Sequence, residues 1–227
     1  MRAERRISWQ TSVAIGLLAV LVLLALPFAL HSLSFGLRGL NSDLSGRTYL
    51  FSSTHPVSNG AIFGHMMAGA AITLLAPLQL VGPLRARFPA VHRFTGYVFF
   101  ACAVATAAGG LAYIVTRRTI GGPLMDYAFA GYGLCVLLAA FQTVRYARAR
   151  DFGRHQRWAL RLFVLAIGSW LYRAHYHLWV GLTGGVGIEP GFTGPFDQVQ
   201  VFAFYVPYLV ALELFFRMRG TSARQLA

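Results

Sequence analysis

The 227-residue sequence has no lysine and few acidic side chains. All 20 of its basic residues are arginine, only seven residues are acidic, and the formal net charge is +13. Charged residues make up 12% of the chain, against about 25% in an ordinary soluble domain, and 56% of it is hydrophobic. This composition argues against a soluble enzyme. The arginines stand in short clusters between long apolar runs, which also argues against a nucleic-acid-binding protein.

Recognised catalytic motifs are missing as well. The two cysteines, Cys102 and Cys135, fall within apolar segments and form neither a metal-ligand set nor a Cys-x-x-Cys-His haem-attachment motif. The sequence contains no Gly-rich phosphate loop, no Ser-His-Asp set and no His-Glu-x-x-His motif. Hydrolases and nucleotide-driven pumps therefore have no support in the sequence.

Six apolar segments are long enough to cross a bilayer, because about 20 residues at about 1.5 Å rise per residue span a hydrocarbon core of roughly 30 Å. They cover residues 11–30, 61–81, 94–116, 124–144, 158–180 and 199–216. Glycine and proline turn signals separate them, and nothing in the sequence suggests a second domain. We therefore predict an all-α protein, a single transmembrane domain over residues 1–227 built as a bundle of six helices.

The distribution of arginine predicts how this bundle is oriented. One side collects Arg2, Arg5, Arg6, Arg85, Arg87, Arg93, Arg145, Arg148, Arg150, Arg154, Arg157, Arg217, Arg219 and Arg224. The other side keeps only Arg38, Arg47, Arg117 and Arg118. Because arginine-rich loops stay in the cytoplasm, we expect a multi-pass inner-membrane protein with both termini cytoplasmic. The arginine clusters should also attract anionic lipids at that face.

Histidines lie at both ends of the predicted bundle. Ionisable residues in or beside membrane helices are costly, so each is a candidate site. His92 and His155 begin predicted helices on the arginine-rich side, whereas His65 and His177 lie at the other side. An electron carrier with two b-type haems needs two such layers, because each iron takes two imidazoles from neighbouring helices. Arginines can pair with the haem propionates.

Helical periodicity identifies the residues of this hypothesis. At about 100° per residue, His155 and Arg173 share one helix face, His177 lies about 40° away, and His175 points in roughly the opposite direction. The predicted site residues are His92 and His155 as ligands of the inner haem, His65 and His177 as ligands of the outer haem, and Arg161 and Arg173 as partners of the propionates or of a quinone head group.

Two other interpretations compete with haem binding. His155 and His177 would be about 33 Å apart on a straight helix, which places both layers at the membrane interfaces and favours ordinary interfacial histidines. A zinc site is the second alternative. Its candidate ligands are His55, His65, His177, Asp126 and Asp197. They form no short-spaced motif, and both aspartates also suit helix starts.

Further polar residues suggest a transport alternative. Gln79 follows His65 by 14 residues and lies about 40° from the same face, so segment 61–81 carries a polar stripe. A non-catalytic membrane protein, or a small-molecule transporter with its pathway along His65 and Gln79, is therefore the alternative function. Glu213 precedes Arg217 by four residues, which predicts an i,i+4 ion pair or a proton-carrying carboxylate.

Several motifs occur together within residues 60–216. They are His65-x13-Gln79, Leu84-Arg85-x-Arg87, His92-Arg93-x-x-Gly96 and His155-Gln156-Arg157-Trp158-x-x-Arg161, followed by Arg173 and by Val206-Pro207 and Leu212-Glu213. This combination resembles a bacterial family of predicted multi-pass membrane proteins catalogued as a domain of unknown function. Tyr97 departs from the pattern, which has a basic residue there.

The histidine-bearing helices are in turn similar to those of cytochrome b561-like and ferric-reductase-like proteins. This fold-level resemblance implies haem b held between helices. We therefore expect a b-type haem protein that passes electrons across or within the membrane, with quinone as a candidate partner.

Overall fold

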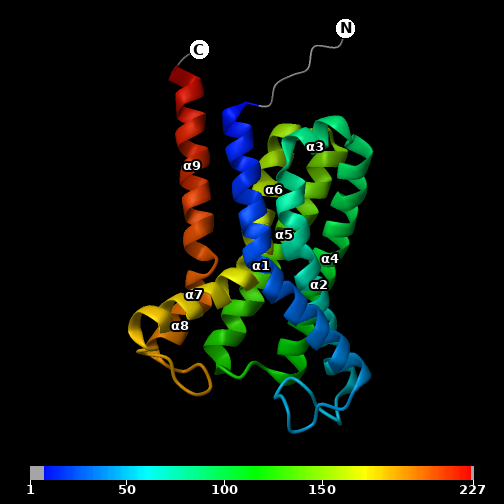
Figure 1. The fold of residues 1–227 in the computed structure, drawn as a ribbon, viewed down its shortest axis with the longest axis vertical. Helices are drawn as coiled ribbons and strands as arrows, with labels where there is room; N and C mark the ends of the chain where they lie inside the picture. Colours follow the sequence, from blue (N-terminus) through cyan, green and yellow to red (C-terminus); the bar gives the residue numbers. More distant parts are fainter. Residues whose placement is uncertain (1–7, 226–227) are drawn as a thin grey trace.

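The computed structural model describes residues 8–225, and within that range the chain is helical apart from its loops, with no strand. In chain order the helices are α1 (Trp9–Asn41), α2 (Pro56–Leu80), α3 (Gly82–Arg87), α4 (Pro89–Arg117), α5 (Gly122–Arg148), α6 (Phe152–Ala166), α7 (Gly168–Thr183), α8 (Pro195–Ala203) and α9 (Val206–Gln225) (Figure 1). The predicted all-α class is confirmed. Arg2, Arg5 and Arg6, used above for orientation, lie outside the described residues.

Five segments are long and apolar enough to cross a membrane: α1, α2, α4, α5 and the α8–α9 run over Pro195–Arg219. The sixth predicted span, residues 158–180, is not one helix, because α6 ends at Ala166 and α7 begins at Gly168. α7 turns away from α6 and lies across the bundle (Figure 1). Another difference is that α1 continues to Asn41, beyond the predicted end at residue 30.

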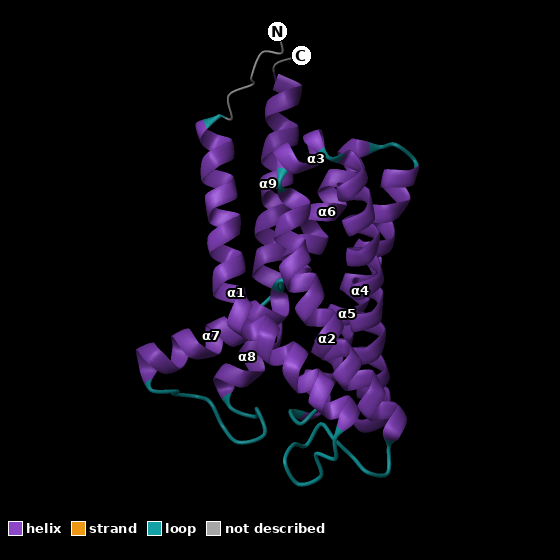
Figure 2. Cartoon of the chain, turned by 45° about the vertical axis from the view of Figure 1, so that its right-hand side comes forward, coloured by secondary structure: helices purple, strands orange, loops and turns teal. Residues whose placement is uncertain are grey.

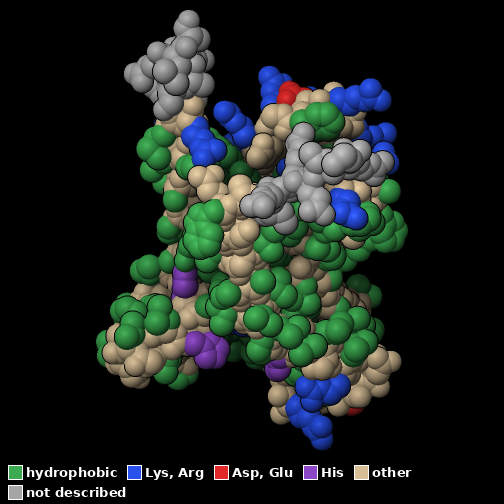
Figure 3. Space-filling view, turned by 45° about the horizontal axis from the view of Figure 1, so that its top comes forward, with side chains coloured by type: hydrophobic (Ala, Val, Ile, Leu, Met, Phe, Trp, Pro, Cys, Tyr) green, Lys and Arg blue, Asp and Glu red, His purple; other side chains and the backbone are tan. Residues whose placement is uncertain are grey.

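The bundle has two distinct ends. The first, which we call the arginine-rich end, carries α3 together with the starts of α4 and α6 and the ends of α5 and α9 (Figure 1). The second, which we call the loop-rich end, carries the loops 42–55, 118–121 and 184–194 (Figure 2). The start of α1 and the end of α9 lie at the same end of the molecule. On the face shown in Figure 3, hydrophobic side chains predominate between the two ends, whereas the arginines gather toward the ends.

The core lies where α2, α4, α5 and α6 pack together. Small buried side chains such as Ala103, Ala139 and Ala140 let these helices approach closely. At Gly109 of α4 the two backbones are in close approach, since a Cβ there would lie 2.5 Å from the carbonyl oxygen of Ala61 on α2. The two free cysteines are half-buried and pack against this core. Tight α2–α4 packing fixes the helix that carries His65.

The break between α6 and α7 is stabilised by neighbouring helices. A continuous helix would satisfy the carbonyl groups of Leu165 and Ala166, which the break leaves without their usual partners. The Tyr132 hydroxyl of α5 donates to the Leu165 carbonyl, and the Thr73 hydroxyl of α2 shares its hydrogen between the Gly69 carbonyl of its own helix at 2.8 Å and the Ala166 carbonyl at 3.2 Å. Gly168 follows directly, and a Cβ there would lie 2.8 Å from the Tyr132 hydroxyl. Irregular backbone at membrane depth is tolerated where protein satisfies it in this way.

Candidate functional site

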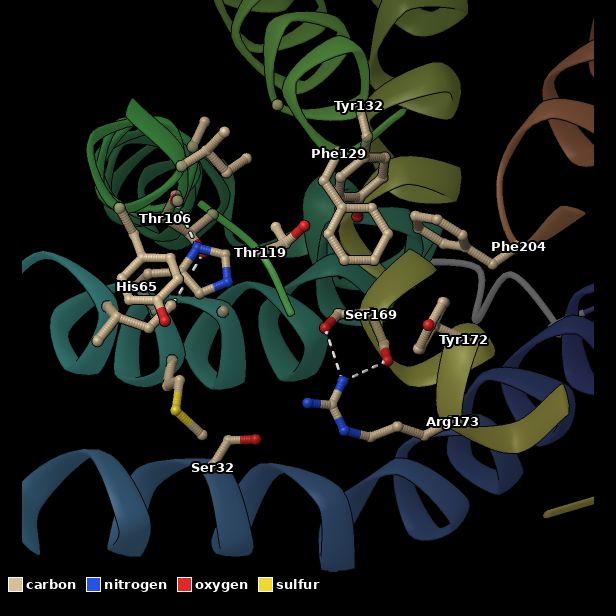
Figure 4. A pocket seen from close by; sticks show the side chains of 18 of the residues that line it. Ser32, His65, Thr106, Thr119, Phe129, Tyr132, Ser169, Tyr172, Arg173 and Phe204 are labelled. Carbon is tan, nitrogen blue, oxygen red and sulfur yellow. Dashed lines mark hydrogen bonds between the residues drawn. The ribbon is translucent and has the colours of Figure 1, made fainter. Parts of the chain in front are cut away.

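A cavity of about 410 Å³ lies between the helices in the half of the bundle nearer the loop-rich end. Its walls come from α1, α2, α4, α5 and α7, with the loop 42–55 at one side (Figure 4). Most of its lining is aliphatic or aromatic. The polar side chains that line it include His65, Arg173, His177, Tyr49, Thr106 and Ser169. Three of the six predicted site residues, His65, Arg173 and His177, therefore share one cavity.

His65 is held in one orientation by α4. Its Nδ1 lies 2.6 Å from the Thr106 carbonyl oxygen, and Thr106 Oγ1 donates to the His65 carbonyl at 2.9 Å (Figure 4). A carbonyl can only accept, so Nδ1 carries the proton and Nε2 keeps a free lone pair. Gly110 makes room for the ring, because a Cβ there would lie 3.0 Å from Nδ1. Nε2 has no hydrogen-bond partner within the described residues.

Arg173 extends from α7 toward α2 and His65 (Figure 4). Its Nη1 donates to the carbonyl and the hydroxyl oxygen of Ser169, at 3.0 and 3.1 Å, and its guanidinium lies 4.8 Å from the centre of the Phe28 ring. No carboxylate among the described residues pairs with it. The cavity thus contains a cation without a counter-ion, in a largely apolar lining.

His177 lies one turn beyond Arg173 on the same helix. Its Nδ1 lies 2.7 Å from the Arg173 carbonyl oxygen, so Nδ1 donates and Nε2 is again the free nitrogen. The neighbouring His175 differs, because its Nδ1 is 3.2 Å from Gln200 Oε1 and its Nε2 is 2.8 Å from the Tyr208 hydroxyl. Only His177 of this pair has a nitrogen available for a ligand.

The loop 42–55 adds Tyr49 to the cavity wall. Arg117 of α4 holds the loop there, since its Nη2 donates to the Tyr49 carbonyl at 3.1 Å. Burial raises the pKa of the Tyr49 phenol above its ordinary value, and the nearby positive charge of Arg173 partly opposes this rise. Sequence reasoning missed both Tyr49 and Thr106, because neither stands near His65 or Arg173 in the chain.

The other predicted histidine pair lies at the arginine-rich end. His92 in the first turn of α4 and His155 in the first turn of α6 are close enough for their charges to interact. His155 Nδ1 lies 2.9 Å from the Thr143 carbonyl oxygen, which leaves its Nε2 free. His65 and His177 thus line one cavity, whereas His92 and His155 lie in the first turns of α4 and α6 at the other end of the bundle.

Arg161 forms an ion pair with Glu213 outside the cavity. Its Nε and Nη2 donate to the two carboxylate oxygens of Glu213 on α9, at 2.6 and 2.9 Å. The guanidinium also lies 4.5 Å from the centre of the Trp158 ring. Arg161 does not line the cavity, so its predicted role toward a propionate or a quinone gains no support. The ion pair of Arg161 with Glu213 instead links α6 to α9.

The helix break also changes the predicted helix face. His155 and Arg173 were placed on one face of a continuous helix, and that reasoning is wrong because α6 and α7 have different axes. The same break removes the objection that His155 and His177 stand about 33 Å apart on one straight axis. From His155 to Ile167 the chain advances along α6 by only about 18 Å before it turns.

The zinc hypothesis gains nothing from the structure. Within residues 8–225 no group of three or more histidine, cysteine, aspartate or glutamate side chains converges as a metal site would require. Asp197 accepts from the Tyr176 hydroxyl and from the Glu189 and Gly194 amides at the start of α8. Asp126 accepts from the Thr119 amide at 2.7 Å. Both aspartates thus stabilise loop and helix ends.

Gln79, the other end of the predicted polar stripe, lies toward the arginine-rich end of α2. Its Nε2 donates to Thr95 Oγ1 of α4 at 2.8 Å. Between His65 and Gln79, α2 buries Ile72 and Ala76 in the central hydrophobic core. The two ends of the stripe are therefore separated by packed apolar side chains.

A family model described as "Predicted membrane protein (DUF2306)" matches residues 62–212. The chain belongs to this family. Its description gives membrane character and no activity. No curated protein and no solved structure matches the chain significantly. The matched range includes every histidine and arginine predicted as a site residue, whereas Phe28, Ser32 and Tyr49, which complete the cavity wall, lie outside it.

Proposed function

We propose that the protein is a b-type haem protein that carries electrons within or across the membrane. One observation supports this above all: two histidines whose Nδ1 atoms donate to carbonyl groups, and an arginine with no carboxylate partner among the described residues, line a single, largely apolar cavity. Haem b requires two nitrogen ligands for its iron, an apolar slot for its ring and a cation for its propionates.

The state of the histidines fits iron ligation. A histidine that binds a metal through one nitrogen nearly always donates its other ring N–H to a carbonyl or carboxylate, which fixes the tautomer and the ring. His65, His177 and His155 each do so, to the carbonyl groups of Thr106, Arg173 and Thr143. In the proposal His65 and His177 hold the outer haem, and His92 and His155 hold the inner one.

Arg173 indicates that the ligand of the cavity is acidic. A charged side chain within a membrane protein is costly unless it is paired, and this one has only its own helix and an aromatic face as partners. A propionate can supply the missing counter-ion through two parallel hydrogen bonds. The cavity volume lies within the range usual for small-molecule and cofactor sites.

The arrangement suits transfer between the two levels. When bound, haem would supply reversible one-electron chemistry, and the residues named here would hold and orient it. Because the chain turns at the α6–α7 break, His177 lies less far from His155 along the α6 axis than it would on one continuous helix. In this proposal a membrane quinone is the redox partner. The arginine distribution supports an inner-membrane location with cytoplasmic termini.

A second function is supported by Arg173 alone. The cavity could hold an acidic small molecule without iron, as a transporter or a non-catalytic binding protein would. The buried residues Ile72 and Ala76 interrupt a path from His65 to Gln79, so transport requires those helices to separate. Haem binding needs no continuous path from His65 to Gln79, and we therefore rank it first.

An optical spectrum tests the proposal. The protein is purified in detergent from haem-replete cells, and spectra are recorded oxidised and dithionite-reduced while haem is quantified in the same sample. We expect a Soret band and sharp reduced α and β bands. His65→Ala should remove the outer haem and His155→Ala the inner one.

His175→Ala is the matched control, because His175 lies on α7 beside His177 but has both ring nitrogens hydrogen-bonded. It should keep the full haem content. A colourless protein would overturn the proposal, and so would equal loss of haem in all three variants. In the colourless case the second function is tested by binding of acidic amphiphiles to wild type and Arg173→Met.

A further inference from the structure

A groove on the outside of the bundle lies between α4 and α5, close to the arginine-rich end. It is lined by Tyr97, Phe100, Phe141, Val144, Arg145 and Arg148. Its floor is aromatic, because Phe100 of α4 meets Phe141 of α5 edge to face, with ring centres 5.3 Å apart. This groove shares no lining residue with the central cavity.

The groove continues as a stripe along α5. Leu134, Leu138, Phe141, Arg145 and Arg148 follow one another at spacings of three and four residues, so they occupy one helix face. Leu134, Leu138 and Phe141 are each more than half exposed, at 58%, 53% and 54%. One face of α5 thus presents an apolar stripe that ends in two arginines.

The two arginines have no acidic partner among the described residues. The Arg145 guanidinium donates to Gln142 Oε1 at 3.4 Å and lies 5.5 Å from the centre of the Tyr146 ring. The ion pairs of the described chain involve Arg118, Arg154 and Arg161 instead. Two adjacent cations at the end of an apolar stripe match a molecule with one anionic head and long apolar chains.

We propose that this groove binds one anionic phospholipid. Its phosphate lies against Arg145 and Arg148, and its acyl chains follow Phe141, Leu138 and Leu134 toward the middle of the membrane. Charge argues against a second copy of the chain as the occupant, since a symmetric contact would bring four arginines together without acids between them. The lipid site is separate from the proposed haem site and does not depend on it.

Native mass spectrometry of the delipidated full-length protein tests this site. Dioleoylphosphatidylglycerol or dioleoylphosphatidylcholine is titrated into the detergent solution, and bound lipids are counted. Each arginine near an anionic head group strengthens binding by about fivefold, so Arg145→Gln/Arg148→Gln should weaken the tightest phosphatidylglycerol site by about 25-fold. Phosphatidylcholine binding should stay unchanged.

The double variant Arg87→Gln/Arg219→Gln is the matched control, because it removes two exposed arginines of the same end outside the groove. It should retain the tight site. Phe141→Ala should weaken the site while leaving the charge intact. Equal weakening in both double variants would overturn the proposal. Displacement of phosphatidylglycerol by equimolar glycerol phosphate would also overturn it, because the head group alone would then suffice.

Discussion

Replacing Arg161 by methionine removes the ion pair that joins α9 to α6. Arg161 donates to both oxygens of Glu213, and its guanidinium also stacks against Trp158 and Phe216, at 4.5 and 5.2 Å from the ring centres. α9 packs mainly against α6 and α8. We therefore expect this cluster to contribute a large share of the docking free energy of α9.

The expected loss of unfolding free energy follows from how exposed the two side chains are. Arg161 is 20% and Glu213 44% exposed, so the pair lies between a surface ion pair, at about 0.2–1 kcal/mol, and a buried one, at about 3–5 kcal/mol. We take about 1.5 kcal/mol for the bidentate bond and about 0.5 kcal/mol for each aromatic contact. Arg161→Met should thus lower the free energy of unfolding by about 2.5 kcal/mol.

A double-mutant cycle separates these contributions. Thermal unfolding in detergent is measured for Arg161→Met, Glu213→Gln and the double variant, and at about 2–4 °C per kcal/mol the first should lower the Tm by about 5–10 °C. The coupling energy should be about 1.5 kcal/mol. Arg157→Met is the control, since Arg157 touches Phe216 without an acidic hydrogen-bond partner, and it should cost less than about 1 kcal/mol. A coupling energy near zero would refute the reasoning.

Three further substitutions test the central cavity and its support. Gly110→Ala places a Cβ 3.0 Å from His65 Nδ1, so the imidazole ring must shift by a few tenths of an ångström. The haem content per protein should therefore fall, while the helicity measured by circular dichroism should stay constant. Tyr132→Phe removes the side-chain donor to the Leu165 carbonyl, which keeps the Ile167 amide as a donor, and should cost about 0.5–1.5 kcal/mol in thermal unfolding; an unchanged Tm would contradict the role given to the hydroxyl. Arg173→Met removes an unpaired cation, so the ligand-free protein should become more stable by about 1 kcal/mol while haem binding weakens; a less stable ligand-free variant would show that Arg173 is adequately satisfied by its own helix.

The histidines illustrate how far sequence reasoning reached at the site. Periodicity and depth predicted two levels, because membrane helices of known length fix how far along the axis a residue lies. In the structure His65 and His177 line the cavity, and His92 and His155 lie in the first turns of α4 and α6. Periodicity could not assign their hydrogen bonds. Thr106 lies 41 residues from His65, and only the packing of α4 on α2 makes it the acceptor that orients the ring. Periodicity did favour His177 over His175, but only the structure shows that both ring nitrogens of His175 are hydrogen-bonded, to Gln200 and Tyr208, whereas His177 uses only Nδ1.

Composition and hydropathy by themselves determined that this chain is a helical membrane protein, since an apolar run of sufficient length leaves the backbone no other way to satisfy its hydrogen bonds in lipid. The tertiary structure decided where a helix stops. The segment 158–180 looks continuous in sequence, and it breaks at Ile167, where the hydroxyls of Tyr132 and Thr73 on other helices donate to the Leu165 and Ala166 carbonyls. That break places Arg173 and His177 beside His65 and so creates the cavity. Contacts between residues distant in the chain are not encoded in any local pattern, and for this protein those contacts form the site.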